Sequence, residues 1–239
     1  MRLKDYLAKR FEPLLERLED KLEEKGKMQK AQQLRHKQFK WHSYTPELRE
    51  VIFLYFQLTY IIRFKIQREA YLQIQHGTLF QQLEANPSGA DTLVTEMQNI
   101  QKQLQDINRE IWNVERGFES AFRLLPEGPF KRALDTSRRN NHFYTTKFCQ
   151  TQCVSVGGCC GRECGCCTRP RNPKRPYHFS HCTAMCKCCE DARGFKIEVN
   201  PSNPTEDPMS VSVPVTDADM KGSSRFYGRD LVSACVWGY

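Results

Sequence analysis

The sequence predicts a mainly α-helical protein, in which an N-terminal helical hairpin or bundle with coiled-coil-like packing is joined to a small cysteine-rich module and a short β tail. Three observations lead to this fold class. Apolar residues recur at helical spacing through the first half of the 239-residue chain, eleven of the twelve cysteines lie between Cys149 and Cys189, and two short alternating segments follow them. We therefore predict two domains, at 1–130 and 131–239.

The first half contains two helical segments before a turn. From Leu3 to Leu22, apolar residues repeat three or four positions apart, which predicts an amphipathic helix. Thr45 and Pro46 form a strong helix start, because threonine caps the free N–H groups and proline suits the first turn. The helix that follows, to about Ala85, is apolar on several faces and must be covered by other parts of the protein.

The segment after the Asn86–Gly89 turn carries the most regular apolar pattern of the chain. Its apolar residues alternate in steps of four and three, as in the a/d seam of a coiled coil. The simplest partner is the preceding helix, folded back as an antiparallel hairpin, and self-association of the seam is the alternative. The seam consists of Leu93, Met97, Ile100, Leu104, Ile107, Ile111, Val114 and Phe118.

Two short segments near the C-terminus resemble strands. Apolar and polar residues alternate in Phe195–Val199 and again in Val211–Val215, with a Pro- and Ser-rich loop between them. This period-2 pattern predicts a short β tail after the cysteine block.

The cysteine block contains a duplicated C-x3-C-x-C-C motif. Cys160, Cys164, Cys166 and Cys167 recur 22 residues later as Cys182, Cys186, Cys188 and Cys189. Such a repeat in register indicates that thiol chemistry organises the segment. Adjacent cysteines rarely face the same ion, so we expect the members of each pair to serve different ions or to bridge two.

The redox compartment favours metal binding over disulfides. No apolar signal-peptide core lies between Met1 and Lys30, and the longest apolar run, Val51 to Ile62, is too short to span a bilayer. We therefore expect an intracellular protein, cytoplasmic or nuclear, without a classical secretion signal or a transmembrane segment. Dense cysteines are more often metal-bound there, although a disulfide scaffold is the alternative.

Zinc is the expected metal, because it holds thiolates deprotonated without redox chemistry of its own. Closed all-thiolate sites leave no position for water, which favours structure over catalysis. We expect about three ions, and an iron–sulfur cluster is the alternative that the C-x3-C-x2-C spacing suggests. His142 and His178 lie at the edges of the block. The expected ligands are Cys149, Cys153, Cys159, Cys160, Cys164, Cys166, Cys167, Cys182, Cys186, Cys188, Cys189 and His181.

The basic residues are concentrated around the cysteines. The net charge is +8, and thirteen Lys and Arg stand against four Asp and Glu between Lys131 and Lys196. We expect these cations mainly to offset thiolate charge, and a nucleic-acid or acidic-partner surface is the alternative. Arg171 and Arg193 occupy matching positions in the two repeats, either as anion contacts or as donors to the thiolates.

No catalytic constellation is present: the chain lacks a phosphate-binding loop, a Gly-x-Ser-x-Gly and a His-Glu-x-x-His. We therefore expect a non-enzymatic zinc-binding interaction or scaffold protein with a structural multinuclear zinc–thiolate cluster. Its helical region would select a protein partner or a second copy. The alternatives are a nucleic-acid-binding regulatory protein that uses the basic block, and a metal-buffering or redox-sensing protein.

The cysteine block also resembles a known group of sequences. The stretch Gly157–Cys167, followed by His181-Cys182-Thr183 and Arg193-Gly194-Phe195, is similar to an uncharacterised family of cysteine-rich proteins of filamentous fungi. The resemblance covers about a quarter of the chain. It implies an intracellular, metal-binding protein with a variable helical region and no assigned catalytic residues. The spacing differs from that of the fungal six-cysteine binuclear cluster and of RING domains.

Overall fold

The computed structural model describes residues 3–42, 45–87, 90–139, 146–201, 207, 209 and 229–238. This part of the chain is mainly helical, as the sequence predicts. It divides into two compact units, and each unit combines segments from both sides of residue 130. Unit 1 comprises Met1–Tyr55, Ala121–Gln150 and Val215–Tyr239, and unit 2 comprises Phe56–Ser120 and Thr151–Pro214.

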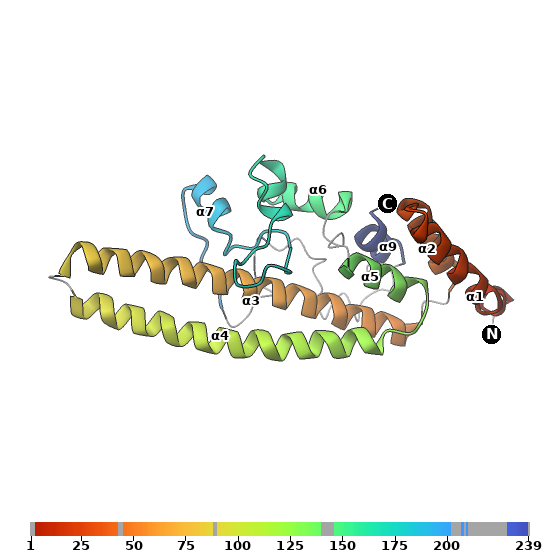
Figure 1. Ribbon diagram of the computed structural model, residues 1–239, viewed down its shortest axis with the longest axis horizontal. Helices are drawn as coiled ribbons and strands as arrows, with labels where there is room; N and C mark the ends of the chain where they lie inside the picture. Colours follow the sequence, from red (N-terminus) through yellow and green to blue (C-terminus); the bar gives the residue numbers. More distant parts are fainter. Residues whose placement is uncertain are drawn as a thin grey trace. The chain divides into compact units, whose positions relative to one another are not determined.

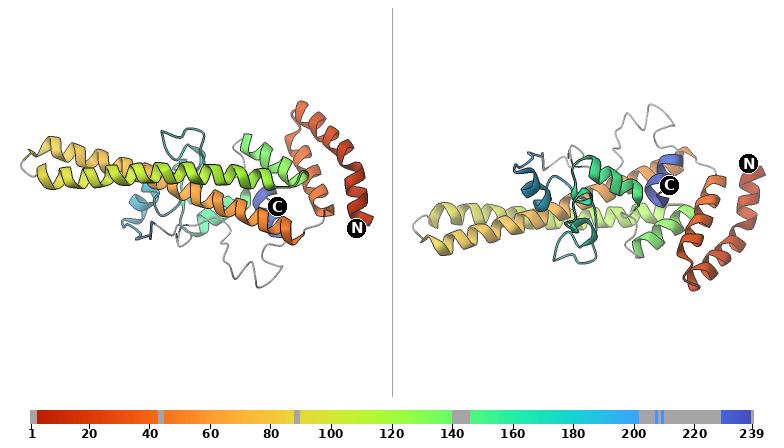
Figure 2. Two further views of the ribbon diagram at one scale, coloured as in Figure 1. Left: turned by 90° about the horizontal axis from the view of Figure 1, so that it is seen from below. Right: turned by 90° about the horizontal axis from the view of Figure 1, so that it is seen from above.

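In unit 1, α1 (Leu3–Glu24) and α2 (Met28–Trp41) pack against each other as a helical pair (Figures 1 and 2). Gly26 allows the tight turn between them, because it adopts the left-handed conformation with a φ of 67°. The Lys27 N–H then donates to the Leu22 carbonyl at 2.7 Å, which satisfies a backbone group at the end of α1. α5 (Pro129–Arg139) and α9 (Arg229–Trp237) pack on α2.

The interior of unit 1 combines an ionic network with an aromatic cluster. Glu19 of α1 is fully buried and accepts hydrogen bonds from the Nε atoms of Arg35 and Arg132, both at 3.0 Å. Such a buried carboxylate is tolerated because two guanidinium groups compensate its charge. Beside it, the rings of Phe39 and Trp237 lie with their centroids 5.1 Å apart.

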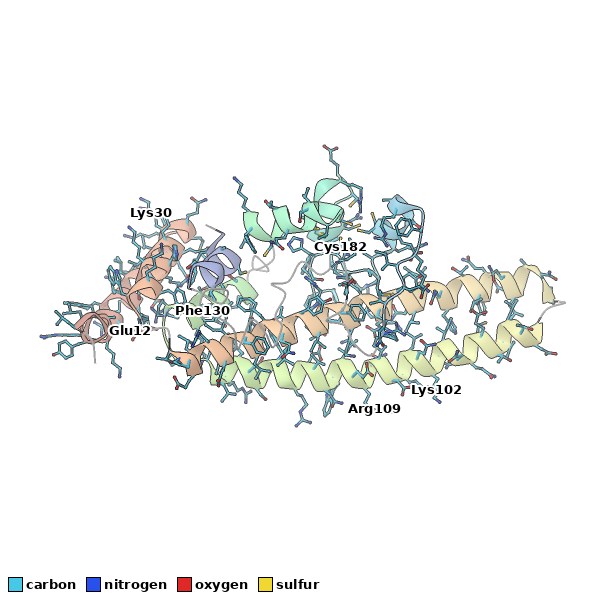
Figure 3. All side chains as sticks on the ribbon, turned by 180° about the vertical axis from the view of Figure 1, so that it is seen from behind. Glu12, Lys30, Lys102, Arg109, Phe130 and Cys182 are labelled. Atoms are coloured by element: carbon cyan, nitrogen blue, oxygen red, sulfur yellow. The ribbon has the colours of Figure 1, made fainter. Side chains whose placement is uncertain are left out.

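α3 (Pro46–Ala85) begins at the predicted position, since the Leu48 N–H donates to Thr45 Oγ1 at 3.2 Å. Within unit 2, α3 and α4 (Ala90–Leu124) lie side by side (Figures 1 and 2), as in the expected hairpin. Polar residues of α4 such as Lys102 and Arg109 point away from α3 (Figure 3). The apolar core between the helices consists of Ile62, Ile66 and Leu72 of α3 and Ile100, Ile107 and Ile111 of α4.

The predicted β tail is wrong for the residues that the structure describes. Phe195–Val199 follows α7 (Lys187–Arg193) without pairing to a strand, and Val211–Val215 lies outside the described residues. The alternation has another cause: Ile197 and Val199 are half-buried and pack against the cysteine core. One covered side of an extended segment gives the same period-2 pattern as a strand.

The cysteine-rich part of unit 2 contains little regular structure. It begins within α6 (Lys147–Ser155), which belongs to unit 2 from Thr151 onward. It continues through the single 3₁₀ turns η2 (Cys159–Gly161) and η3 (Cys166–Thr168), and ends in α7. Its buried core consists mainly of cysteines, together with Ala184 and Met209. No helix in the described parts of the chain is sufficiently long and apolar to cross a membrane.

Candidate metal centre

The described cysteines and His181 form three groups of four residues, each of which could hold a metal ion. Within every group, one ligand atom per residue lies within 4.8 Å of the other three. All twelve cysteines are free thiols rather than disulfides. Group 1 is Cys153, Cys160, Cys167 and His181; group 2 is Cys159, Cys164, Cys166 and Cys188; group 3 is Cys159, Cys182, Cys186 and Cys189.

The separations within these groups fit tetrahedral coordination. Two thiolates bound to one zinc ion at about 2.3 Å stand about 3.8 Å apart. In group 3, Cys159 Sγ lies 3.7 Å from Cys186 Sγ and 3.3 Å from Cys189 Sγ. In group 1, Cys160 Sγ lies 3.3 Å from His181 Nδ1. The donor set, thiolates with one imidazole, is the one that zinc prefers in closed sites.

Every adjacent pair of cysteines is divided between groups, as expected from the sequence. Cys160 and Cys167 belong to group 1, whereas their neighbours Cys159 and Cys166 belong to group 2. Cys188 and Cys189 are divided in the same way between groups 2 and 3. Cys159 is shared by groups 2 and 3, which is the position of a bridging thiolate.

The two sequence repeats do not form two equivalent sites. The first repeat supplies ligands to groups 1 and 2, and the second supplies ligands to groups 3 and 2. Group 2 therefore joins the repeats, since Cys164 and Cys166 come from the first and Cys188 comes from the second. The Sγ atoms of Cys167 in group 1 and Cys182 in group 3 lie 3.6 Å apart. The three groups thus form one continuous cluster.

Ten of the eleven cysteines expected as ligands are in the cluster, and Cys149 is not. Cys149 lies at the start of α6 in unit 1, where it raises the pKa of Cys235 in addition to the larger effect of burial. His142 lies outside the described residues. His178 belongs to none of the groups, and its pKa is lowered to about 4 by burial and then by Arg175, so it is neutral at pH 7.

Glycines shape the backbone beneath the cluster. A Cβ added at Gly158 would lie 2.4 Å from Cys153 Sγ and 2.7 Å from the Cys153 carbonyl oxygen, so no larger residue fits there. Gly165 has a φ of 65°, a left-handed conformation that reverses the chain between Cys164 and Cys166.

Two arginines offset the charge of the thiolates. Arg162 donates to Cys189 Sγ at 2.9 Å and to the Gly157 carbonyl at 2.8 Å. Arg171 is half-buried, which opposes its charge, yet its pKa is raised because Cys186 and Cys182 lie close to it. Arg193, its counterpart in the second repeat, lies over the ring of Phe195 instead. Charge compensation therefore holds for Arg171, and the sequence reasoning missed Arg162.

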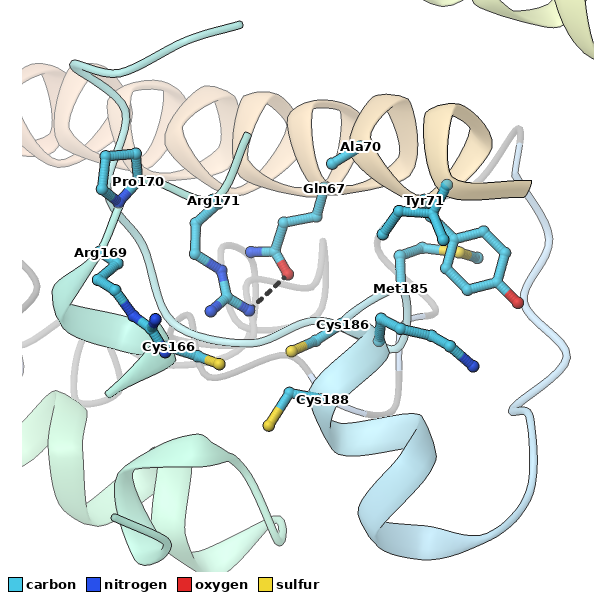
Figure 4. Close-up of a pocket in the computed structure, with 12 residues that line it drawn as sticks. Gln67, Ala70, Tyr71, Cys166, Arg169, Pro170, Arg171, Met185, Cys186 and Cys188 are labelled. Carbon is cyan, nitrogen blue, oxygen red and sulfur yellow. Dashed lines mark hydrogen bonds between the residues drawn. The ribbon is translucent and has the colours of Figure 1, made fainter. Parts of the chain in front are cut away.

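Gln67 of α3 fixes the segment that carries His181. Its side chain is 3% exposed, and its Nε2 donates to the His181 carbonyl at 2.7 Å and to Ser180 Oγ at 3.0 Å. Its Oε1 accepts from the Thr183 N–H at 3.1 Å, from Thr183 Oγ1 at 3.0 Å and from Arg171 at 3.2 Å (Figure 4). This residue was not identified from the sequence, where one glutamine in a long helix gives no signal.

Glu69, two residues further along α3, holds the loop between the two repeats. It is 1% exposed, and it accepts from Asn172 Nδ2 at 2.6 Å and Arg175 Nε at 2.8 Å. Arg175 also donates to Asn108 of α4 at 3.1 Å. The basic loop between the repeats is therefore attached to the helices through part of its charge, rather than being a wholly solvated loop.

The thiols share protons unequally before a metal binds. The pKa of Cys186 is lowered to about 6 by a hydrogen bond with Cys159, and the pKa of Cys182 is lowered by hydrogen bonds from Cys153 and other neighbours. Burial raises the pKa of Cys160 to about 12 and of Cys166 to about 11. The cluster thus combines thiolate acceptors with protonated donors, and metal binding must displace protons from the latter.

Comparison with known proteins adds no identification: no family model, curated protein or solved structure matches the chain.

Proposed function

We propose that this chain is a non-enzymatic zinc-binding interaction or scaffold protein, in which three zinc ions form a structural cluster with ten cysteines and His181. The observation that carries the proposal is the arrangement of these residues in three four-ligand groups that share Cys159. Twelve coordination positions supplied by eleven residues satisfy three tetrahedral ions, with one bridging thiolate.

The chemistry of the donors supports zinc and a structural role. Three zinc ions and ten thiolates carry a net charge of about −4, and Arg162 and Arg171 lie beside the thiolates to offset part of it. Each group already has four protein ligands, so no position remains for a substrate or a reactive water. The core of the module is built from cysteines, and bound metal would supply the folding energy that apolar residues supply elsewhere.

The internal contacts of the basic loop favour charge compensation over nucleic-acid recognition. Arg171 and Arg175 donate to Gln67 and Glu69 of α3, and Arg169 donates to the Cys164 carbonyl at 2.6 Å. An arginine that is held by protein acceptors is less available to neutralise phosphates. The helical region remains our proposed site for a protein partner or for self-association.

Native mass spectrometry with elemental analysis tests the proposal on full-length protein purified under reducing conditions without added metal. We expect three zinc ions per chain, and hydrogen exchange should show that residues 147–195 lose protection when a chelator removes them. Iron with sulfide would replace the proposal by an iron–sulfur protein. A metal-free chain whose mass shows paired, oxidised cysteines would refute the zinc cluster.

Metal buffering at group 2 is a second candidate function, favoured by the exposure of that group. Cys164, Cys166 and Cys188 are half-buried, whereas the four residues of group 3 are all buried. A cavity of about 240 Å³ adjoins Cys166 and Cys188 (Figure 4). A chromogenic chelator should then remove one ion rapidly and two slowly. Equal rates for all three ions would eliminate buffering and leave the structural role intact.

A further inference from the structure

α1 presents a stripe of large apolar side chains to solvent. At about 100° per residue, these side chains fall within an arc of about 140° around the helix. Exposed apolar residues usually occur singly, and a continuous stripe marks a binding surface. The stripe consists of Leu3, Tyr6, Leu7, Phe11, Leu14 and Leu18, which are between 42% and 74% exposed.

The charged residues of α1 are sorted between its two sides. Arg10, Arg17 and Lys21 are exposed and fall in the same arc as the apolar stripe, and the exposed Glu24 falls at the edge of this arc. The acidic residues Glu12, Glu16, Glu19 and Glu23 fall on the opposite side.

Unit 1 uses this acidic side for its own packing. Arg132 contacts Glu12 at 3.4 Å and Glu19 at 3.0 Å, and Arg35 contacts Glu23. These contacts fix the rotation of α1 about its own axis. They turn its acidic side inward and leave an apolar and basic side outward.

We propose that this outward side, which we call the α1 face (the six stripe residues with Arg10, Arg17 and Lys21), binds an anionic lipid surface. A helix lying in the plane of a bilayer buries leucine and aromatic side chains at the level of the headgroups. The long stems of arginine and lysine extend from the same side to the lipid phosphates. The absence of acidic residues from the centre of this arc matches a negatively charged surface.

A second copy of the chain fits the α1 face less well. Pairing two α1 faces would bring Arg10, Arg17 and Lys21 of each copy against the same cations of the other, and such juxtaposition of like charges opposes association. An acidic amphipathic helix of another protein has suitable charge. It would not require the aromatic side chains Tyr6 and Phe11, which are favoured at a membrane interface.

Sedimentation of the full-length, metal-loaded chain with lipid vesicles tests the proposal. We expect the chain to bind phosphatidylcholine vesicles that contain about one third phosphatidylserine, and to bind pure phosphatidylcholine vesicles at least about tenfold more weakly. Added salt should weaken the binding to the anionic vesicles. Leu7→Ser with Leu14→Ser should abolish binding, because it removes the centre of the stripe. Arg10→Glu with Arg17→Glu should remove the preference for anionic lipid.

Matched controls separate this surface from general changes in charge or hydrophobicity. Leu124→Ser removes a leucine of unit 1 that is more exposed than Leu7 and Leu14, and Lys30→Glu reverses an exposed charge on α2. Both should bind as the native chain does, and circular dichroism should show that every variant is folded. The proposal is overturned if the native chain ignores anionic vesicles or if the stripe variants bind normally. Binding of an acidic amphipathic peptide without binding of vesicles would identify a protein partner instead.

Discussion

Replacing Gln67 by methionine tests whether α3 positions the His181 segment. Methionine fills a similar volume but makes none of the five hydrogen bonds of Gln67. The Thr183 N–H would then be buried without the acceptor that Gln67 provides, since Thr183 is 0% exposed. The loss of its acceptor costs about 1–3 kcal/mol for this N–H, and the four other lost hydrogen bonds cost about 1 kcal/mol each.

We therefore expect Gln67→Met to lower the free energy of unfolding by about 5–7 kcal/mol. Denaturant unfolding of the metal-loaded chain measures this change, and hydrogen exchange locates it at residues 180–186. Competition with a chelator should show weaker binding of one ion of the three, because His181 is a ligand of group 1 alone.

Two further variants make the Gln67 test specific. Gln67→Glu keeps the acceptor for Thr183 and Arg171 but loses the donor to His181, so its effect should be intermediate. Gln81→Met changes an exposed glutamine of the same helix and should have an effect within about 0.5 kcal/mol. The reasoning fails if Gln67→Met matches Gln81→Met in stability and in exchange at 180–186.

Three other outcomes are expected. Gly158→Ala should reduce zinc affinity at group 1, because the added Cβ would lie 2.4 Å from Cys153 Sγ. In the control Gly161→Ala the added Cβ lies 3.4 Å from a side chain, so this variant should bind zinc normally. Titration against a chelator compares the two variants, and equal zinc affinities would contradict this account of the turn. Cys159→Ser should lose two ions, Cys160→Ser one and Cys149→Ser none in native mass spectra, because Cys159 serves two groups. Zinc binding at pH 7 should release protons from Cys160 and Cys166, because the pKa values of their thiols are raised to about 12 and about 11. The zinc affinity should therefore increase as the pH rises towards these values. Calorimetry in buffers of different ionisation enthalpy measures the release, and its absence would show that the thiols are already ionised.

The sequence predicts the helices and the clustering of the cysteines better than it predicts what connects them. Thr45 and Pro46 mark the start of α3. The apolar residues spaced four and three apart in α4 mark the side of α4 that contacts α3. Both signals are local: the first depends on capping of the backbone N–H groups, and the second on burial of one side of the helix. The division of adjacent cysteines between the three groups is also local, since neighbouring side chains diverge.

The features that the sequence does not predict depend on residues distant along the chain. Cys149 matches the spacing of the other cysteines, yet none of the three groups includes it. Ile197 and Val199 alternate because a cysteine core covers one side, which no local pattern distinguishes from a strand. Gln67 and Glu69 contact groups more than a hundred residues away, and such contacts leave no periodic trace.

The contacts within unit 2 make the metal cluster and the α3–α4 hairpin depend on each other. The cysteine module has few apolar residues, so without bound ions its chain entropy would outweigh its packing. α3 in turn is apolar on several faces and contains Gln67 and Glu69, which are buried by the loop and by the segment that carries His181. Removal of the ions would release that segment and expose both polar side chains together with the apolar surface around them. In the zinc-bound state that we propose, loading of the cluster would therefore determine whether this side of α3 is covered.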